Sequence, residues 1–313
     1  MSRTARAYLL GLFLWAVSFI IALKTGAVYN PDHSIVFQLR LPRAILSTAI
    51  GMGLSVSGAT LQALFSNPLC EPYTLGISSG AALGAVLGIS LGLEWTFIGV
   101  SLSSFLGAVS FAFILYVLST RRSADNTILL LAGVMLGLVG SSLVALWMTF
   151  SDPKGVQAAV TWLMGDLYHS RLQGSVLSLA FSLVLCMALW CNWQKLDAFL
   201  MGEESAKALG VSVKRVRGFL IFLVSLLVAV CVSSAGSIGF IGLIIPHWVR
   251  KMTGSMHFQL IPLCAIWGAA ALTLADALAR WVARPYEIPV GVITALIGAP
   301  LFLWIMLNRR QTA

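Results

Sequence analysis

The sequence predicts an all-α integral membrane protein with ten transmembrane helices, one of which is short and partly re-entrant. The first observation behind this prediction is composition: of 313 residues, 59% are hydrophobic and only 10% are charged, whereas soluble domains carry roughly 25% charged residues. The second is a mean hydropathy of +0.93. A chain with so few charges cannot cover itself with a hydrated surface, so lipid must surround most of it. This excludes disordered chains, nucleic-acid-binding proteins and ordinary cytosolic enzymes.

The third observation is the spacing of the charged residues, which divides the chain into long uncharged stretches. A helix needs about 20 apolar residues to cross a hydrocarbon core of about 30 Å, so eight of these stretches each predict one span. None is polar enough to form a soluble module, and residues 1–313 therefore form a single transmembrane domain. The stretches are 7–23, 44–70, 72–93, 95–120, 126–151, 172–194, 218–249, 252–275 and 288–308.

The stretch 218–249 is long for one helix and short for two full ones. With the N-terminus inside, a single crossing places 11 Lys and Arg residues inside and 9 outside, whereas a crossing with a return places 13 inside and 7 outside. The positive-inside rule favours the return. The run SSAGS at 233–237 supplies a polar, flexible turn. We therefore expect a full span at 218–234 and a short, partly re-entrant helix near 239–250.

Glycines recur every four residues at Gly76, Gly80, Gly84 and Gly88. This spacing removes the side chains from one face of a helix and lets a neighbouring backbone approach closely. It predicts tight helix packing and no chemistry.

The sequence lacks the motifs of catalysis and energy conversion. Asp276 is the one carboxylate in an apolar stretch, which disfavours ion-coupled carriers because these use intramembrane carboxylates or histidines as relays. The sequence contains no P-loop motif for ATP binding and no HExxH motif for zinc binding, and its five cysteines form no CxxC motif. We therefore expect no catalytic residue, no metal site and no cofactor bound by this chain. Any transport must draw its energy from a partner.

Basic residues gather where this topology places the outer surface. Arg40 and Arg43 flank Pro42 just before the second span, and Arg280 and Arg284 lie on one face at the end of the ninth. Because proline stiffens the backbone, we expect the first two guanidiniums to point to water. The arginines either anchor helix ends at the membrane surface or form a basic ring that docks an acidic partner. Their position on the side disfavoured for positive charge points to docking.

Two further segments stand out. Between the sixth and seventh spans, Glu204, Ala208 and Val211 share one helical face, and Gly210 would end a short helix. This segment is either a solvated connection or a rigid helix that fits a groove on a cytoplasmic motor. The run 237–247 is broken by glycine and proline and predicts an irregular helix. His247 within it has no metal partners at useful spacing and predicts a packing role.

Taken together, these segments resemble the permeases that import ferric siderophores, haem and cobalamin, which are the membrane subunits of type II ABC importers. The resemblance covers residues 40–309, and one departure is Cys70, where a small residue such as Ala is expected. The motifs that carry the resemblance are RLPR at 40–43, SGATLQALFSNPL at 57–69, LGISSGA at 75–81, ALG at 208–210, GFIGLIIPH at 239–247 and PVGVITALIGAP at 289–300.

The resemblance implies a permease of ten helices that pairs with a second copy of itself or with a homologous permease. Two cytoplasmic ABC ATPase subunits would use the ATP, and a periplasmic or lipoprotein substrate-binding protein would dock on the outer side. The implied location is the bacterial inner membrane, with both termini cytoplasmic, membrane lipid around the chain and no nucleic acid among its partners.

The resemblance also implies roles for individual residues. Arg40, Arg43 and Arg280 match the arginines that receive acidic residues of the binding protein. Asn126 and Thr127, at the polar start of the fifth span, match the cytoplasmic gate. A coupling helix at about 202–212 would fit the cleft of the ATPase. Its matching residues are Glu203, Glu204, Ala208, Leu209, Gly210 and Val211.

The implied function is ATP-driven uptake of a bulky metal chelate by alternating access. Ferric siderophores come first as the most common cargo of the family, and cobalamin or haem is the alternative. Two remote alternatives are an intramembrane enzyme, which would need a polar catalytic cluster, and a scaffold, which would need no coupling helix.

Overall fold

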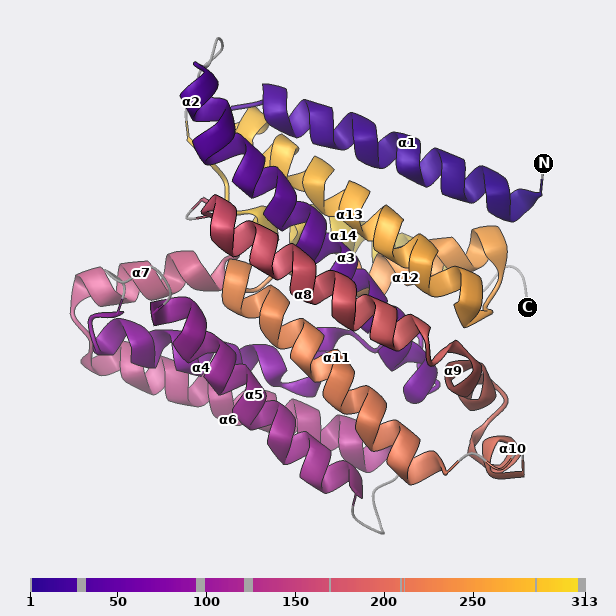
Figure 1. Ribbon diagram of the computed structural model, residues 1–313. Helices are drawn as coiled ribbons and strands as arrows, with labels where there is room; N and C mark the ends of the chain where they lie inside the picture. Colours follow the sequence, from indigo (N-terminus) through magenta and orange to yellow (C-terminus); the bar gives the residue numbers. More distant parts are fainter. Residues whose placement is uncertain are drawn as a thin grey trace.

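The computed structural model describes residues 2–26, 32–93, 99–120, 126–168, 170–208, 210, 212–284 and 286–308. In these ranges the chain is helical, and its long helices run side by side (Figure 1). The helices are α1 (Arg3–Lys24), α2 (His33–Ile35), the π-helix η1 (Val36–Arg40), α3 (Leu41–Leu64), the 3-10 helix η2 (Pro72–Leu75), α4 (Ile77–Ser90), α5 (Gly99–Thr120), α6 (Asn126–Phe150), α7 (Pro153–Leu163), α8 (Leu172–Trp190), α9 (Trp193–Leu200), α10 (Glu203–Ala208), α11 (Val213–Ala235), α12 (Ile241–Thr253), α13 (His257–Val282) and α14 (Val290–Asn308).

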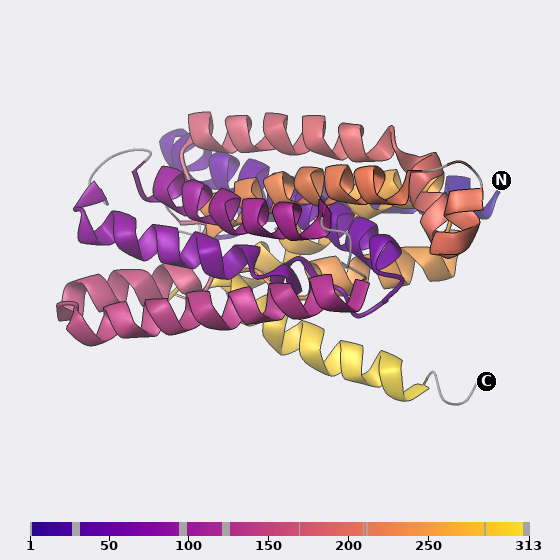
Figure 2. The same ribbon diagram turned by 90° about the horizontal axis from the view of Figure 1, so that it is seen from below.

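Eight helices in the described ranges are long and apolar enough to cross a membrane. The shorter α4 and α12, with 14 and 13 residues, complete the ten predicted crossings. The start of α1, the end of α14, and α10 lie at one end of the bundle, and α7 lies at the other (Figure 2). An even number of crossings places the two ends of a chain on the same side, in agreement with ten. The predicted fold class is confirmed.

The bundle is built around α3, which packs against α8, α11, α12 and α13. Three of the predicted glycines, Gly80, Gly84 and Gly88, face α5, and Gly76 faces α6. A Cβ on Gly84 would lie 2.1 Å from the Ser103 carbonyl oxygen, and a Cβ on Gly107 would lie 2.2 Å from that of Gly80. The two backbones are therefore in contact, and glycine serves packing here as predicted.

The long stretch 218–249 is divided as predicted. Helix α11 ends at Ala235, residues 236–240 are not helical, and α12 begins at Ile241. We call residues 236–240 the break. Its backbone groups need partners at membrane depth, and Glu71 and Tyr73, from the connection before α4, accept hydrogen bonds from two of them.

Two elements differ from the prediction. The third span occupies only Ile77–Ser90 of the stretch 72–93, because residues 72–75 form the separate turn η2. Helix α7 was not expected, although Asp152 at its N-cap and Pro153 in its first turn are typical start signals. No long uncharged stretch marks this helix, because Asp152 and Lys154 interrupt the sequence at its beginning.

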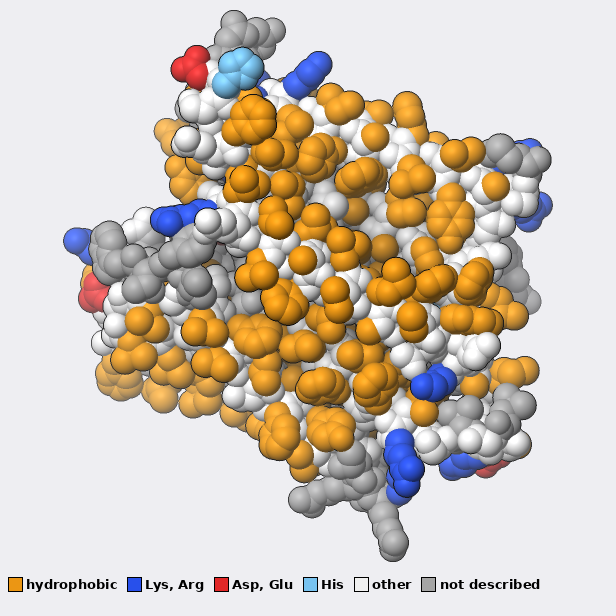
Figure 3. Space-filling model, in the orientation of Figure 1, with side chains coloured by type: hydrophobic (Ala, Val, Ile, Leu, Met, Phe, Trp, Pro, Cys, Tyr) orange, Lys and Arg blue, Asp and Glu red, His pale blue; other side chains and the backbone are white. Residues whose placement is uncertain are grey.

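The outer surface of the bundle is apolar along the length of the helices. Hydrophobic side chains cover the face over α8 and α11, and the visible Lys, Arg, Asp and Glu side chains lie toward the edges of this view (Figure 3). Leu177, Leu183 and Val184 of α8 are each more than half exposed. Such a surface requires lipid contact.

Candidate functional site

The arginines predicted to lie at the outer surface meet in one cluster at the end of the bundle that carries α2 and α7. Arg43 Nε lies 2.8 Å from Asp276 Oδ1, and its Nη1 lies 2.5 Å from Glu287 Oε2. Arg280 Nη2 lies 2.9 Å from Asp276 Oδ2. Asp276 is fully buried, and its carboxylate forms ion pairs with both guanidiniums. We call Arg40, Arg43, Arg280, Asp276 and Glu287 the arginine cluster.

The same cluster closes the C-terminal end of α1. The last carbonyls of a helix have no intrahelical donor and carry partial negative charge, so guanidiniums stabilise them. Arg40 and Arg280 supply these donors from two other helical segments. Arg40 Nη1 donates to the carbonyls of Leu23 (3.0 Å) and Lys24 (2.8 Å), and Arg280 Nη1 donates to those of Ala22 (3.0 Å) and Thr25 (2.8 Å).

The expectation that Arg40 and Arg43 point to water is wrong. Arg40 is 4% exposed, Arg43 6% and Arg280 3%. Their partners come from α1, α13 and the segment after α13, so the sequence near Pro42 gives no sign of them. The cluster lines a recess of about 120 Å³, and its three guanidiniums face two carboxylates, leaving an excess of positive charge. The docking role assigned to Arg40, Arg43 and Arg280 stays a prediction, acting through this recess.

Arg284 offers a clean test of docking, because it is exposed and contributes its charge beside Arg40. Reversal by Arg284→Glu should slow association with the expected acidic surface of the binding protein on the order of tenfold at low salt, because rim charges act mainly on encounter rates. Surface plasmon resonance measures this. Lys251→Glu, an exposed reversal at the opposite end, is the control, and equal association rates for the two variants would remove the docking role.

The predicted coupling segment lies at the opposite end of the bundle and contains α10. Ala206 is fully buried, while Glu204, Ala208 and Gly210 are exposed. Among the side chains of α10 whose burial the structure describes, Ala206 is the buried one and the others face outward. Glu203 begins α10. Leu209 and Val211 lie outside the described residues.

The support beneath α10 runs through α9 to the long helices. Helix α10 packs on α9, and α9 packs on α3 and α13. The Asp197 carboxylate of α9 accepts a hydrogen bond from the His257 backbone N–H at 2.9 Å, and His257 Nδ1 lies 2.7 Å from the same oxygen. These contacts connect α10, through α9, to the first turn of α13.

Gly210 has φ +78°, and a Cβ added there would meet nothing within 4 Å. A substitution therefore strains the backbone without a clash. A β-branched residue avoids this conformation, whereas Asn tolerates it. Gly210→Val should reduce transport per ATP hydrolysed several-fold, and Gly210→Asn should keep the ratio. The two rates are measured together in proteoliposomes. Normal coupling in Gly210→Val would show that this segment transmits no motion.

The predicted gate residues stand at the first turn of α6, at the same end of the bundle as α10. Asn126 is half-buried and Thr127 is exposed. Asn126 Oδ1 is buried and accepts no hydrogen bond within the described structure. The structure thus places a polar turn at the end of this helix, and the gating role stays a prediction.

Sequence reasoning missed a polar contact at the break. Glu71 was expected in the connection between the second and third spans, but that connection folds back against α12. Glu71 Oε1 accepts a hydrogen bond from the Phe240 N–H at 2.5 Å, and the Tyr73 hydroxyl accepts one from the Ile238 N–H. Phe240 has φ +68°, a strained value for this residue. These two side chains satisfy two of the backbone N–H groups at the break.

A second part of this contact joins α3 to the start of α12. Gln62 Nε2 donates to the carbonyls of Cys70 (3.2 Å) and Gly242 (3.1 Å), and Arg250 donates to Gln62 Oε1. The one sign of this contact in the sequence was a polar residue, Gln62, within an apolar stretch. Cys70 stands where a small residue such as Ala was expected, and its carbonyl still takes part in this turn. Among the described residues, no group of three or more His, Cys, Asp or Glu side chains could hold a metal ion.

A bundle of this kind, with broken helices at membrane depth, a charged recess at one end and an outward-facing short helix at the other, defines a transport permease. The chain belongs to the FecCD transport family, whose model matches residues 5–308. It is the permease subunit of an ABC transporter, and the ATP is used by a partner ATPase.

Relatives extend over nearly the whole chain. The cobalamin import system permease protein BtuC of Halobacterium salinarum is 42% identical over 89% of this chain and 75% of its own length. The Fe(3+)-citrate import system permease protein YfmE of Bacillus subtilis is 36% identical over 97% of each chain. A solved inward-facing conformation of a metal-chelate type ABC transporter is 33% identical, with a TM-score of 0.88 over 97% of this chain and 99% of that chain. The two relatives are thus named for the import of cobalamin and of ferric citrate, and the solved structure for metal chelates.

Proposed function

We propose that this permease imports cobalamin or a close corrinoid by alternating access, in the bacterial inner membrane and with both chain ends in the cytoplasm. The observation that supports cobalamin as the cargo is the 42% identity to a cobalamin import permease, compared with 36% to a ferric citrate import permease. The sequence prediction placed ferric siderophores first by their frequency in the family. They become the second candidate, supported by the ferric citrate relative, and haem stays a further alternative.

The partners follow from the two ends of the bundle. A periplasmic or lipid-anchored binding protein would dock over the arginine cluster and release cargo into the pathway. Two ATPase subunits would hold the exposed face of α10 and move it on ATP binding. Asn126 and Thr127 would close the cytoplasmic end between cycles.

The pathway itself requires a second permease, either the same chain or a homologue. Helix α14 projects from the bundle on the side opposite α8 (Figure 2). Leu303, Trp304 and Leu307 of this helix are at least 60% exposed. We place the partner permease against α6 and α14, so that the pathway runs between the two copies.

The test is uptake by the complete transporter. The permease is purified in mild detergent with the ATPase and binding protein recovered from its native membranes, and the complex is reconstituted in liposomes. ATP-dependent accumulation of radiolabelled cobalamin, with little accumulation of ferric citrate or a ferric siderophore, is the expected result. The control is the same liposomes without ATP. Accumulation of the ferric chelate alone would replace cobalamin with the second candidate, and accumulation of neither would overturn the proposal.

A further inference from the structure

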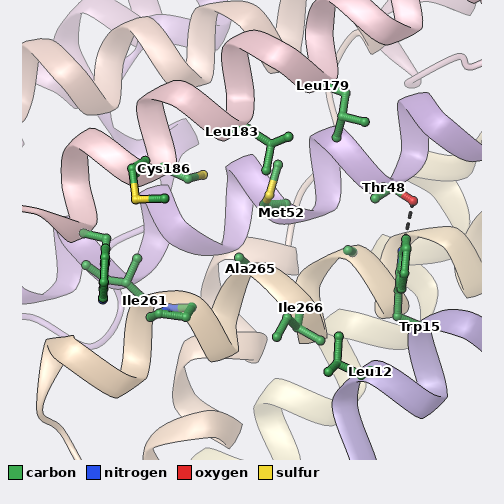
Figure 4. Close-up of a pocket in the computed structure, with 14 residues that line it drawn as sticks. Leu12, Trp15, Thr48, Met52, Leu179, Leu183, Cys186, Ile261, Ala265 and Ile266 are labelled. Carbon is green, nitrogen blue, oxygen red and sulfur yellow. Dashed lines mark hydrogen bonds between the residues drawn. The ribbon is translucent and has the colours of Figure 1, made fainter. Parts of the chain in front are cut away.

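A large groove lies on the flank of the bundle, away from the regions assigned above. It has a volume of about 620 Å³, within the range of roughly 300–1,000 Å³ that holds small ligands. Its walls are Leu12 and Trp15 of α1 on one side and Leu183 of α8 on the other (Figure 4). Its floor is formed by Met52 of α3 and Ala265 of α13. We call it the α1–α8 groove.

The lining is apolar, and its polar atoms are occupied within the protein. Trp15 Nε1 donates to Thr48 Oγ1 at 3.2 Å (Figure 4), and Trp190 Nε1 donates to the Phe258 carbonyl at 2.9 Å. The groove therefore presents carbon and sulfur and no unpaired donor. Neither water nor an extended peptide, whose backbone groups need partners, suits such a surface.

The position of the groove selects the occupant. It runs from the middle of α1 and α8 to the C-terminal end of α8, along the first half of α13, and on the flank opposite the projecting α14. These three helices are long and apolar enough to cross the hydrocarbon core. A second permease on the α6 and α14 side therefore does not cover it. An empty recess facing lipid would forfeit the dispersion contacts of its lining. Acyl chains are the material available to fill it.

The end of the groove toward the chain termini carries the matching polar groups. Exposed Arg3 and Arg6 precede Leu12 and Trp15 on α1, and exposed Lys195 follows α8. Trp190 and Trp193 both pack against Phe258 there, and aromatic side chains of this kind sit at headgroup level. Anionic headgroups are attracted to such basic residues by about 1 kcal/mol per Lys or Arg.

We infer that the α1–α8 groove is a specific binding site for one anionic phospholipid. An acyl chain fills the groove, and the headgroup lies beside Arg3, Arg6 and Lys195. The lipid reaches the central helix α3, which is otherwise covered by other helices, and fills the space between α1 and α8. This site requires the membrane-spanning fold and is independent of the proposed cargo.

The test counts phospholipid retained by the purified protein in native mass spectrometry. After delipidation and addition of phosphatidylglycerol, the wild-type chain should retain one lipid per permease. Ala265→Phe fills the floor of the groove and should abolish retention. Val184→Phe places the same side chain on α8 at a position 65% exposed and outside the groove, and it should retain the lipid. Size-exclusion profiles and melting temperatures establish that both variants are folded.

Equal retention by the wild-type chain and Ala265→Phe would overturn the site, as would retention of no lipid by a folded wild-type chain. A parallel addition of phosphatidylcholine tests the headgroup. Preferential retention of phosphatidylglycerol, reduced by Arg6→Gln, is expected. Equal retention of both lipids would overturn the assignment of the basic residues to the headgroup.

Discussion

Replacement of Asp276 by alanine is expected to destabilise the protein by about 3–5 kcal/mol, because it leaves two buried guanidiniums without their shared carboxylate. Asp276 is fully buried and pairs with both Arg43 and Arg280. Arg280 also holds the end of α1, so the loss should spread to the contact between α1 and α13. A thermal melt of the protein in lipid nanodiscs measures the effect as a lower Tm.

Glu287→Gln is the matched control for this prediction. Glu287 belongs to the same cluster, but its side chain is 33% exposed, so water compensates part of the lost charge. We expect a smaller fall in Tm for this variant. If Asp276→Ala and Glu287→Gln melt at the same temperature, the buried pairs do not stabilise this end of the bundle.

The second large effect is expected where α3 crosses α13. A Cβ on Gly268 would lie 2.1 Å from Ser55 Oγ and 2.3 Å from the Gly51 carbonyl oxygen. One of these neighbours is backbone within a buried helix and cannot move aside without separating the two helices. Gly268→Ala should therefore cost more than the roughly 1–3 kcal/mol typical of overpacking, and most of the expressed chain should fail to fold.

Gly174 in α8 provides the comparison, because a Cβ there would meet nothing within 4 Å. The same substitution at this position should be neutral or stabilise the helix by about 0.5–1 kcal/mol. Yields of monodisperse protein by fluorescence-detection size-exclusion chromatography separate the two outcomes. Folded protein in equal yield from both variants would contradict the close crossing of α3 and α13.

The crossings were predictable because they follow from local properties of the chain. Charge spacing marked the long helices, and the distribution of Lys and Arg required the return within 218–249. The run at 233–237 marked the break itself. These signals depend only on the membrane as solvent, which acts on each segment independently.

The environment of the candidate sites was not predictable in the same way. Arg43 pairs with Asp276 and Glu287, more than 200 residues away in sequence, so the arginines that the sequence placed in water are buried. Glu71 separates the stretches 44–70 and 72–93, and nothing nearby in sequence shows that this connection folds back to Phe240. The i, i+4 spacing of Asp276 and Arg280 was the one local sign of the cluster.

The anchoring of α1 has a consequence for any conformational cycle. At one end Arg280 holds the carbonyls of Ala22 and Thr25, and at the other Trp267 Nε1 donates to the Ala7 carbonyl at 3.3 Å. Both donors belong to α13, so the first helix is fastened to α13 near each of its ends. The two helices are therefore expected to move as one unit in any conformational change of the permease.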